Sequence, residues 1–308
     1  MATLLNDTID FGAYMDDTDA AHKVRSTEVF VEDVIRHFHA AEEQHGCWLP
    51  WPKTRSLIRL RSGEVTLWTG YNSHGKSILL GMICMGLVQQ GQGVCIASME
   101  MKPAVTLGRM CRQAYGDRRP DVGFIREFSK GTNRRLWLYD QQGTVKAEKM
   151  LAIVRYCADQ LKVGHIVIDS LMKCGMGEDD YNAQKAFVDS LTATARDHDI
   201  HVHLVAHARK PKDDKTPPGK MDVKGTGSIT DQVDNVVTVW RNKAKELASQ
   251  DGSNYDPKAP DAVLICDKQR NGEWEGKIPL WFHSPSGQFI ENGVDGPMAL
   301  LRGGIAGE

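Results

Sequence analysis

The sequence lacks the features of an exported, membrane-spanning or zinc-binding protein. No apolar run approaches the ~20 residues that a helix needs to span a bilayer. The first 25 residues have neither the basic start nor the apolar stretch of a signal peptide. The seven cysteines form no C-x-x-C pair, which is typical of reduced thiols and argues against a zinc site. We therefore expect a cytoplasmic protein that has no membrane partner.

Positive charge is not in excess either, since 38 Lys and Arg stand against 40 Asp and Glu and the net charge is −2. This balance argues against a protein that coats nucleic acid over its whole surface. It does not exclude a single basic channel or loop, because the distribution of charge decides that question. The 308 residues, of which 41 % are hydrophobic, suffice for one large domain or two ordinary ones.

The most informative motif is Gly-Tyr-Asn-Ser-His-Gly-Lys-Ser at residues 70–77, which matches the pattern G-x-x-x-x-G-K-[ST]. Residues 64–69 before it read as a strand, and residues 78–90 after it read as an apolar helix with Gly91 as its C-cap. Successive backbone N–H groups and a helix N-terminus can surround a polyphosphate. We therefore predict that ATP or another nucleoside triphosphate binds to Gly70, Tyr71, Asn72, Ser73, His74, Gly75, Lys76 and Ser77.

Two side chains of this motif and one later carboxylate are candidates for binding the phosphates and a Mg²⁺ ion. Lys76 adds a mobile positive charge at the β- and γ-phosphates, and the Ser77 hydroxyl is a ligand for Mg²⁺. His165-Ile-Val-Ile-Asp169 is an apolar strand that ends in a carboxylate, which can hold Mg²⁺ directly or through water. We therefore predict a metal site formed by Ser77 and Asp169.

Segments of strand and helix type alternate through most of the chain. Short apolar runs of buried-strand type occur at residues 94–99, 136–139, 165–169 and 202–206. Residues 144–161 lie between two of them and have helical spacing. This alternation predicts an α/β fold with a mostly parallel central sheet. An antiparallel extension of the sheet is predicted from the later runs at 236–240, 262–267 and 277–281.

The two ends of the chain differ from this central part. Residues 1–25 are polar and without period, and we expect them to be flexible. Residues 26–60 contain a helix with one apolar face, followed by a segment that leads into the main domain. We assign residues 61–290 to the main domain and the glycine-rich residues 291–308 to a flexible tail.

Two further polar residues follow predicted strands at the edge of the nucleotide site. Glu100 comes after the strand at 94–99 and could polarise the water that attacks the γ-phosphate. It could equally be a charge favoured by the N-terminus of the next helix, and position alone does not decide. His207 comes after the strand at 202–206 and could contact the γ-phosphate, or it could be structural.

Several basic residues fit phosphate contacts outside this motif. The loop at 209–224 carries six Lys and Arg against three Asp, and with the loop at 173–182 it could face a polymer or simply be solvated surface. Lys268 and Arg270 alternate along a strand and therefore point the same way. They could serve a phosphate, including that of a neighbouring subunit, or be exposed charges at a strand end.

Four further motifs follow the nucleotide loop in a fixed order: Ser98-Met-Glu-Met101, Val167-Ile-Asp-Ser170, Asp222-Val-Lys-Gly-Thr-Gly-Ser-Ile229 and Lys268-Gln-Arg-Asn-Gly272. With these motifs the chain resembles the RecA-type motor domain of the DnaB-family hexameric helicases, which include the phage primase-helicases and the mitochondrial helicase Twinkle. The likeness covers about residues 48–289.

The resemblance implies a role for each candidate residue. Lys76 and Ser77 would bind phosphate and Mg²⁺, and Asp169 would support the metal. Glu100 would be the catalytic base and His207 the sensor of the γ-phosphate. Arg270, with Lys268, would act in trans on ATP bound to the next subunit.

The same resemblance implies how the molecule works. It would be an ATP-dependent DNA helicase that moves 5′→3′ on single-stranded DNA as a ring, with a homo-hexamer expected. The loops at 173–182 and 209–224 would hold the DNA, and the helix at 29–44 would be a linker that docks on a neighbouring subunit. Since only about 60 residues stand before the motor in this sequence, we expect no primase domain, and a primase, polymerase or loader would be a separate protein. The setting would be a bacterial cell or a phage-infected host.

Two other functions share the same core and stay open from the sequence. The first is a RecA-like recombinase or recombination mediator, for which Phe38-His-Ala-Ala41 matches the F-x-x-A form of a polymerisation motif. The second is a DNA-binding regulatory ATPase that does not translocate. The nucleotide motif is common to all three functions and does not separate them.

Overall fold

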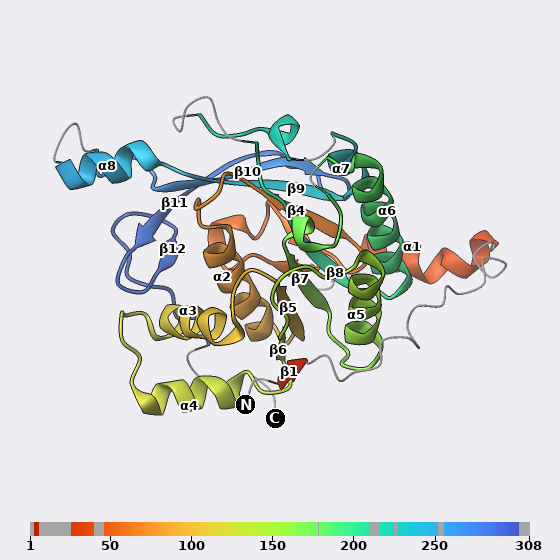
Figure 1. Ribbon diagram of the computed structural model, residues 1–308, viewed down its shortest axis with the longest axis horizontal. Helices are drawn as coiled ribbons and strands as arrows, with labels where there is room; N and C mark the ends of the chain where they lie inside the picture. Colours follow the sequence, from red (N-terminus) through yellow and green to blue (C-terminus); the bar gives the residue numbers. More distant parts are fainter. Residues whose placement is uncertain are drawn as a thin grey trace.

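The computed structural model describes residues 3–5, 26–39, 46–177, 179–209, 216–224, 227–251 and 256–301. Within these residues the main sheet has ten strands, in the order β1-β6-β5-β7-β8-β4-β9-β10-β11-β12 (Figure 1). Its strands are β1 (Thr3–Leu5), β4 (Val65–Thr69), β5 (Val94–Ser98), β6 (Leu136–Tyr139), β7 (His165–Asp169), β8 (His201–Val205), β9 (Asn235–Arg241), β10 (Ala262–Gln269), β11 (Gly276–His283) and β12 (Gln288–Ile290). Strands β2 (Cys47–Trp48) and β3 (Arg59–Leu60) form a separate antiparallel pair.

Helices cover both faces of the sheet. The α-helices are α1 (Val31–His39), α2 (Lys76–Gln89), α3 (Pro103–Tyr115), α4 (Val122–Gly131), α5 (Ala147–Asp159), α6 (Tyr181–Asp197), α7 (Gly227–Gln232) and α8 (Lys243–Asp251). Short 3₁₀ turns occur at η3 (Thr27–Phe30), η5 (Pro52–Thr54), η6 (Leu171–Lys173) and η7 (Lys220–Asp222). None of the described helices combines the length and the apolar character needed to cross a membrane.

Alternate residues of each central strand enter two different cores. On β7, Ile166 and Ile168 pack in a cluster with residues of α5, α6 and α7, whereas Val167 packs in a cluster with residues of α2, α3 and α4. Figure 1 shows these two groups of helices on opposite faces of the sheet. Because both faces are covered, the strands read in the sequence as continuous apolar runs rather than as alternating ones.

The mostly parallel sheet with an antiparallel extension confirms the predicted fold class. Strands β6, β5, β7, β8, β4 and β9 are parallel neighbours, and β10, β11 and β12 are antiparallel. The direction of β9 was predicted wrongly, since Leu67 of β4 pairs with Val236 in parallel. A parallel partner requires a crossover connection, and here α7 lies in that connection.

The end of α2 has the predicted glycine cap. Gly91 has φ +85°, its N–H donates to the Val88 carbonyl at 3.0 Å, and Gln92 N donates to Leu87 O at 3.0 Å. These two bonds form a Schellman motif, which needs a residue in the left-handed region at this position. The predicted role of Gly91 is confirmed.

Both ends of the chain contribute structure that the sequence did not predict. Within 1–25, expected to be flexible, Thr3–Leu5 adds a parallel edge strand to β6, and the remaining residues lie outside the described part. Within 291–308, also expected to be flexible, Leu300 is 3 % exposed and joins the core beside α2. The Gln288 side chain bonds the backbone of Met298 through both its oxygen and its nitrogen. The unpaired backbone groups of β6 explain why the strand at 3–5 adds to it. The apolar surface beside α2 explains why Leu300 is buried there.

The segment that leads into the main domain is part of its core. Leu49 and Trp51 are fully buried, and Trp51 Nε1 donates a hydrogen bond to the Phe289 carbonyl at 2.7 Å. The boundary expected after residue 60 therefore lies further toward the N-terminus. The predicted helix before this segment appears as η3 and α1, and residues 40–45 of it lie outside the described part.

Three histidines lie buried side by side in the central strands. His165 Nδ1 is 3.3 Å from His203 Nε2, and the rings of His201 and His203 have centroids 4.6 Å apart. Trp68 Nε1 donates to His203 Nδ1 at 3.2 Å, and Thr66 Oγ1 lies 2.9 Å from His201 Nε2. Burial lowers the pKa of His201 to about 4 and holds the pKa of the other two well below 6.5. The cluster is therefore neutral at neutral pH.

The neutral histidines predict acid destabilisation. Because their pKa values are lower in the folded than in the unfolded chain, the unfolded chain binds protons first as the pH falls. The free energy of unfolding should decrease below about pH 6.5, by up to about 1.4 kcal/mol per pH unit for each histidine that stays neutral. Denaturant titrations between pH 7.5 and 5.5 should show a smaller decrease for His203→Gln than for the wild type. The partly exposed His198, substituted as His198→Gln, is the control, and a flat wild-type profile would contradict this account.

Candidate functional site

The predicted phosphate-binding residues form the turn between β4 and α2. Gly70 has φ +145°, and a Cβ atom there would lie 2.2 Å from the Val239 carbonyl oxygen. Gly75 has φ +87°, and its Cβ would lie 2.9 Å from the Phe289 ring. Glycine is needed at both positions because of the backbone conformation and because of these close neighbours. The resulting loop brings backbone N–H groups to the N-terminus of α2, which is the arrangement that favours an anion.

The other side chains of this loop are divided between its inside and the solvent. Tyr71 and His74 are buried, with ring centroids 5.2 Å apart, and His74 Nδ1 accepts a hydrogen bond from Arg241 N at 3.0 Å. Asn72 and Ser73 are exposed, and Ser73 has φ +62°. The two exposed residues form the tip of the loop, while the two buried ones anchor it to the strand β9.

The Lys76 ammonium lies inside the loop. Its Nζ donates to the carbonyls of Gly70 at 2.8 Å and Tyr71 at 2.9 Å, and the residue is 6 % exposed. Burial lowers the pKa of Lys76 to about 8, and the carboxylates of Asp169 and Glu100 oppose that shift. A phosphate in the loop would add negative charge beside the ammonium and favour its protonated form.

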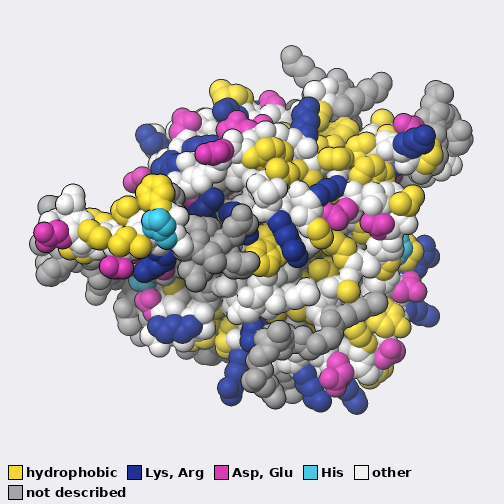
Figure 2. All heavy atoms as spheres, turned by 180° about the vertical axis from the view of Figure 1, so that it is seen from behind, with side chains coloured by type: hydrophobic (Ala, Val, Ile, Leu, Met, Phe, Trp, Pro, Cys, Tyr) yellow, Lys and Arg dark blue, Asp and Glu magenta, His cyan; other side chains and the backbone are white. Residues whose placement is uncertain are grey.

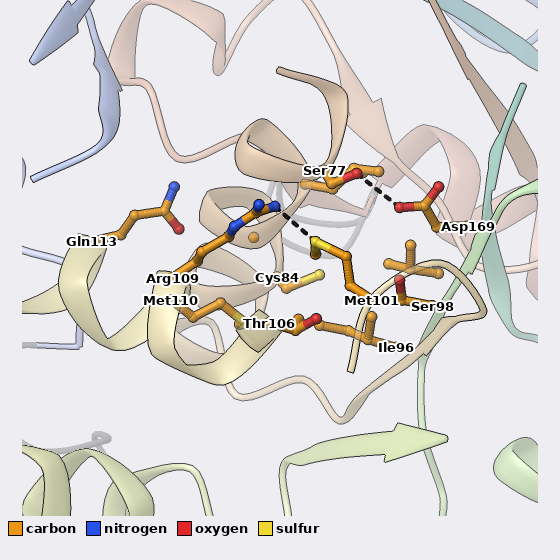
Figure 3. Close-up of a pocket in the computed structure, with 13 residues that line it drawn as sticks. Ser77, Cys84, Ile96, Ser98, Met101, Thr106, Arg109, Met110, Gln113 and Asp169 are labelled. Carbon is orange, nitrogen blue, oxygen red and sulfur yellow. Dashed lines mark hydrogen bonds between the residues drawn. The ribbon is translucent and has the colours of Figure 1, made fainter. Parts of the chain in front are cut away.

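Ser77 and Asp169 meet as the sequence predicted. Ser77 Oγ, in the first turn of α2, donates a hydrogen bond to Oδ2 of Asp169, the last residue of β7, at 2.8 Å (Figure 3). Burial raises the pKa of Asp169, and the bond from Ser77 partly offsets this. A hydroxyl and a carboxylate oxygen held this close fit the oxygen ligands of Mg²⁺. These two residues could hold the metal beside the phosphates.

Glu100 and His207 also come together at this edge of the sheet. His207 Nε2 lies 3.7 Å from Glu100 Oε1, and Ser170 Oγ donates to the same oxygen at 3.2 Å. The neighbouring His207 imidazole is the main cause of the lowered pKa of Glu100, and the Ser170 bond adds to it. Glu100 is therefore ionised at neutral pH and can accept a proton or orient a water.

The predicted loop at 209–224 follows His207 after one residue, Ala208. Lys224 N donates to the His207 carbonyl at 2.7 Å, Arg209 N donates to Asp222 O at 2.7 Å, and Ala208 pairs with Val223. These contacts form a stem under the loop, whose residues 210–215 lie outside the described part. Of the other predicted loop, 173–182, the first residue ends η6 and the last two already begin α6. Of the two loops, the one at 209–224 is thus joined directly to His207.

Lys268 and Arg270 do not join this group. Strand β10 runs against β9, so Gln269 pairs with Asn235, and Asn235 pairs with Thr66 at the start of β4. The nucleotide loop leaves β4 at its other end, roughly 15 Å away by the rise of a strand. Lys268 and Arg270 therefore lie at the edge opposite the loop of their own chain.

Sequence reasoning missed several residues of the site. Ser170 was quoted only as part of a motif, yet it bonds Glu100. Arg241 has its guanidinium 4.6 Å from the centre of the Phe282 ring, and its backbone contacts His74 of the loop. Asp234 Oδ1 lies 3.4 Å from Arg270 Nε. No local pattern assigns a role to any of these three residues, because each acts through a partner distant in the sequence.

A small pocket adjoins the Ser77–Asp169 pair. Figure 3 shows the Arg109 guanidinium of α3 directed toward the sulfur of Met101, and Arg109 Nη1 lies 2.8 Å from Met101 Sδ. Met101 directly follows Glu100. The start of the segment after β5 is thus held against α3 beside the predicted metal ligands.

Comparisons with known proteins agree with this architecture. The family described as the DnaB-like helicase C-terminal domain matches residues 56–291, well over half of the chain. A solved structure described as an ATPase domain has a TM-score of 0.72 and 16 % identity, covering 87 % of this chain and 99 % of that chain. A second, described as a DnaB-like replicative helicase and its interactions with primase, has a TM-score of 0.71 and 16 % identity, covering 87 % and 69 %. The shared fold is the predicted RecA-like one.

Gly75 allows a matched test of the loop. Gly143 has nearly the same φ, +88°, but no atom within 4 Å of a Cβ, whereas a Cβ at Gly75 meets the Phe289 ring. Gly143→Ala should cost about 1–2 kcal/mol of stability from backbone conformation alone and leave nucleotide affinity unchanged. Gly75→Ala should cost more stability and weaken binding of a fluorescent ATP analogue about tenfold or more, because the loop must shift. Equal effects of the two substitutions on nucleotide affinity would contradict this reading.

Proposed function

The chain belongs to the family of DnaB-like helicase C-terminal domains and is an ATP-hydrolysing helicase domain, and we propose that it translocates on single-stranded DNA as a ring. Each ATP would lie between two subunits. The observation that carries this proposal is the distance between the phosphate-binding loop and the two cations Lys268 and Arg270 of the same chain. Residues 70–77 lie at one edge of the sheet, and Lys268 and Arg270 lie at the other. Lys268 and Arg270 can therefore contact a phosphate of ATP only if that ATP is bound to the loop of a neighbouring copy.

We propose that residues of one subunit bind the nucleotide and its metal ion and activate the attacking water. Lys76 would bind the β- and γ-phosphates, and Ser77 and Asp169 would hold Mg²⁺, which neutralises phosphate charge when bound. Glu100, ionised and held by Ser170, would orient and deprotonate the attacking water. The short distance between Glu100 and His207 supports a shared role at the γ-phosphate.

The stem under the loop at 209–224 supports a coupling between ATP and DNA. The His207 carbonyl accepts a hydrogen bond from Lys224 N, so a movement of the His207 backbone would be passed to the stem. Backbone phosphates of DNA would bind the basic loop through contacts that weaken with salt. Loss of the γ-phosphate would then move a DNA contact. This coupling is the basis for proposing translocation, with 5′→3′ direction taken from the family.

The apolar face of α1 supports the docking of one subunit on the next. Figure 2 shows hydrophobic side chains along the helix that projects at the left of that view. Val34 and Ile35 are about half exposed, and Phe38 is 72 % exposed. An uncovered apolar face of this kind marks an interaction surface. We propose that α1 is the linker helix and packs on a neighbouring copy in a closed ring.

Further partners and the cellular setting follow from the same proposal. One of the similar solved structures is described as interacting with primase. We propose that priming, loading and polymerase contacts of this chain are made with separate proteins, in the cytoplasm of a bacterial or phage-infected cell.

The role of Glu100 has a direct test. Glu100→Gln keeps the shape of the side chain but removes the base, so DNA-stimulated ATP hydrolysis should fall on the order of 100-fold or more. Equilibrium binding of ATP should stay nearly unchanged, since no phosphate contact is removed. The exposed residue Glu148 provides the control Glu148→Gln, with full activity expected. Hydrolysis that survives in Glu100→Gln would assign the base to another residue.

The role of α1 has an equally direct test. Ile35→Asp places a charge on the apolar face, so assembly with ATP and a single-stranded oligonucleotide should give monomers instead of a discrete oligomer near six subunits. Glu32→Gln on the same helix is the control and should assemble normally. Native mass spectrometry gives the count. Long filaments in the wild type would favour the recombinase alternative, and unchanged assembly of Ile35→Asp would remove α1 from the interface.

A further inference from the structure

Asp234 is a buried carboxylate shared by three groups. Its side chain is 3 % exposed, and Oδ2 accepts a hydrogen bond from Val65 N at 2.9 Å. Oδ1 lies 3.4 Å from Arg270 Nε and 3.3 Å from Arg196 Nη2. A carboxylate this deeply buried is stable only with charged partners and hydrogen bonds. Two arginines and the first backbone N–H of β4 supply them here.

The same turn of chain holds both predicted trans-acting cations. Lys268 Nζ donates to the carbonyls of Thr230, Asp231 and Val233 at 2.7–2.9 Å. Arg270 Nη2 donates to the carbonyls of Asp231 and Gln232. These carbonyls end the helix α7, where the helix dipole favours positive charge. Residues 230–234 therefore bind both cations, through their backbone carbonyls and the Asp234 carboxylate.

The orientation of the Arg270 guanidinium follows from these contacts. Its Nε and Nη2 form one edge of the planar group, and that edge is taken by Asp234 and by the end of α7. The side chain is still 43 % exposed, and the described contacts do not involve Nη1. The guanidinium is thus held by one edge and presents the other to the solvent. An arginine held in this way is already oriented toward an acceptor outside its own chain.

We propose that Asp234 is the positioning residue for Arg270: it fixes the guanidinium so that the free edge meets the γ-phosphate bound by the neighbouring subunit. This inference rests on the proposed trans-acting role of Arg270. Arg196 is the second arginine on the Asp234 carboxylate and would hold that carboxylate in place. Asp234 also accepts a hydrogen bond from Val65 at the start of β4. The position of Arg270, which we call the finger, is therefore tied to the strand that carries the nucleotide loop of its own subunit.

The first test is Asp234→Asn, which retains an oxygen for Val65 N but removes the charge. DNA-stimulated kcat for ATP should fall on the order of 10- to 100-fold with little change in KM, because the finger is misplaced while the nucleotide loop is intact. Asp261 is a matched control, since its carboxylate also pairs with a cation, Lys245, and accepts a backbone N–H, that of Phe282. Asp261→Asn should keep kcat. Unchanged kcat in Asp234→Asn would overturn the proposal.

The second test separates a role in the neighbour's site from damage to the subunit's own site. Asp234→Asn subunits carry an intact Lys76, and Lys76→Ala subunits carry an intact finger. Mixed oligomers of these two impaired variants should have more ATPase activity than either variant alone, since some interfaces combine an intact Lys76 with a correctly placed Arg270. If Asp234 acted through β4 on its own nucleotide loop, no interface would be complete. Absence of regained activity would overturn the proposal.

A parallel mixture shows whether the underlying function holds. Arg270→Ala mixed with Lys76→Ala must also regain activity if Arg270 acts in trans. Failure of that mixture would refute the trans-acting finger itself, whereas failure of the Asp234 mixture alone would refute only the positioning role. Asp234→Glu keeps the charge but shifts the carboxylate by one methylene, and it replaces Asp234→Asn if that variant does not fold. It should give the same pattern of regained activity.

Discussion

The common direction of the central strands is the constraint on which the rest of the structure depends. Strands β5, β7, β8 and β4 run the same way, so the residues that follow them meet at one edge of the sheet. Glu100, Asp169, His207 and the loop at 70–77 are collected there. Strand β10 runs against its neighbour and carries Lys268 to the opposite edge. The charged groups are thus divided between the two edges by strand direction, before any side-chain contact is made.

Features that depend on local sequence could be predicted, and those that depend on distant partners could not. The nucleotide loop, the cap at Gly91 and the strand ending in Asp169 are each determined within a few residues, by backbone conformation and apolar runs. The contact of Asp234 with Arg270 joins residues from different elements, and neither residue type signals it. The direction of β9 and the burial of Leu300 depend likewise on which surfaces other elements leave open. Such information arises only from the packed structure.

Charges of opposite sign compensate one another in the interior of the site. The Lys76 ammonium is buried near Asp169 and Glu100, and burial alone would favour the neutral forms of all three. The attraction of the Lys76 ammonium for the two carboxylates, with the hydroxyls of Ser77 and Ser170, keeps charged groups available for phosphate chemistry. Removing one member of such a group leaves its partners without compensation, so single substitutions there are expected to affect more than one step.

Phe289 connects two parts of the molecule that have been described separately. Its ring occupies the space next to Gly75, and its carbonyl receives the indole N–H of Trp51. The segment that contains Trp51 continues toward α1, which projects from the body of the subunit. A displacement of Trp51 would therefore reach, through one aromatic residue, the glycine that precedes α2. The entry segment at residues 46–60 and the phosphate-binding turn thus meet at a single side chain, so a change in the packing of one should alter the other.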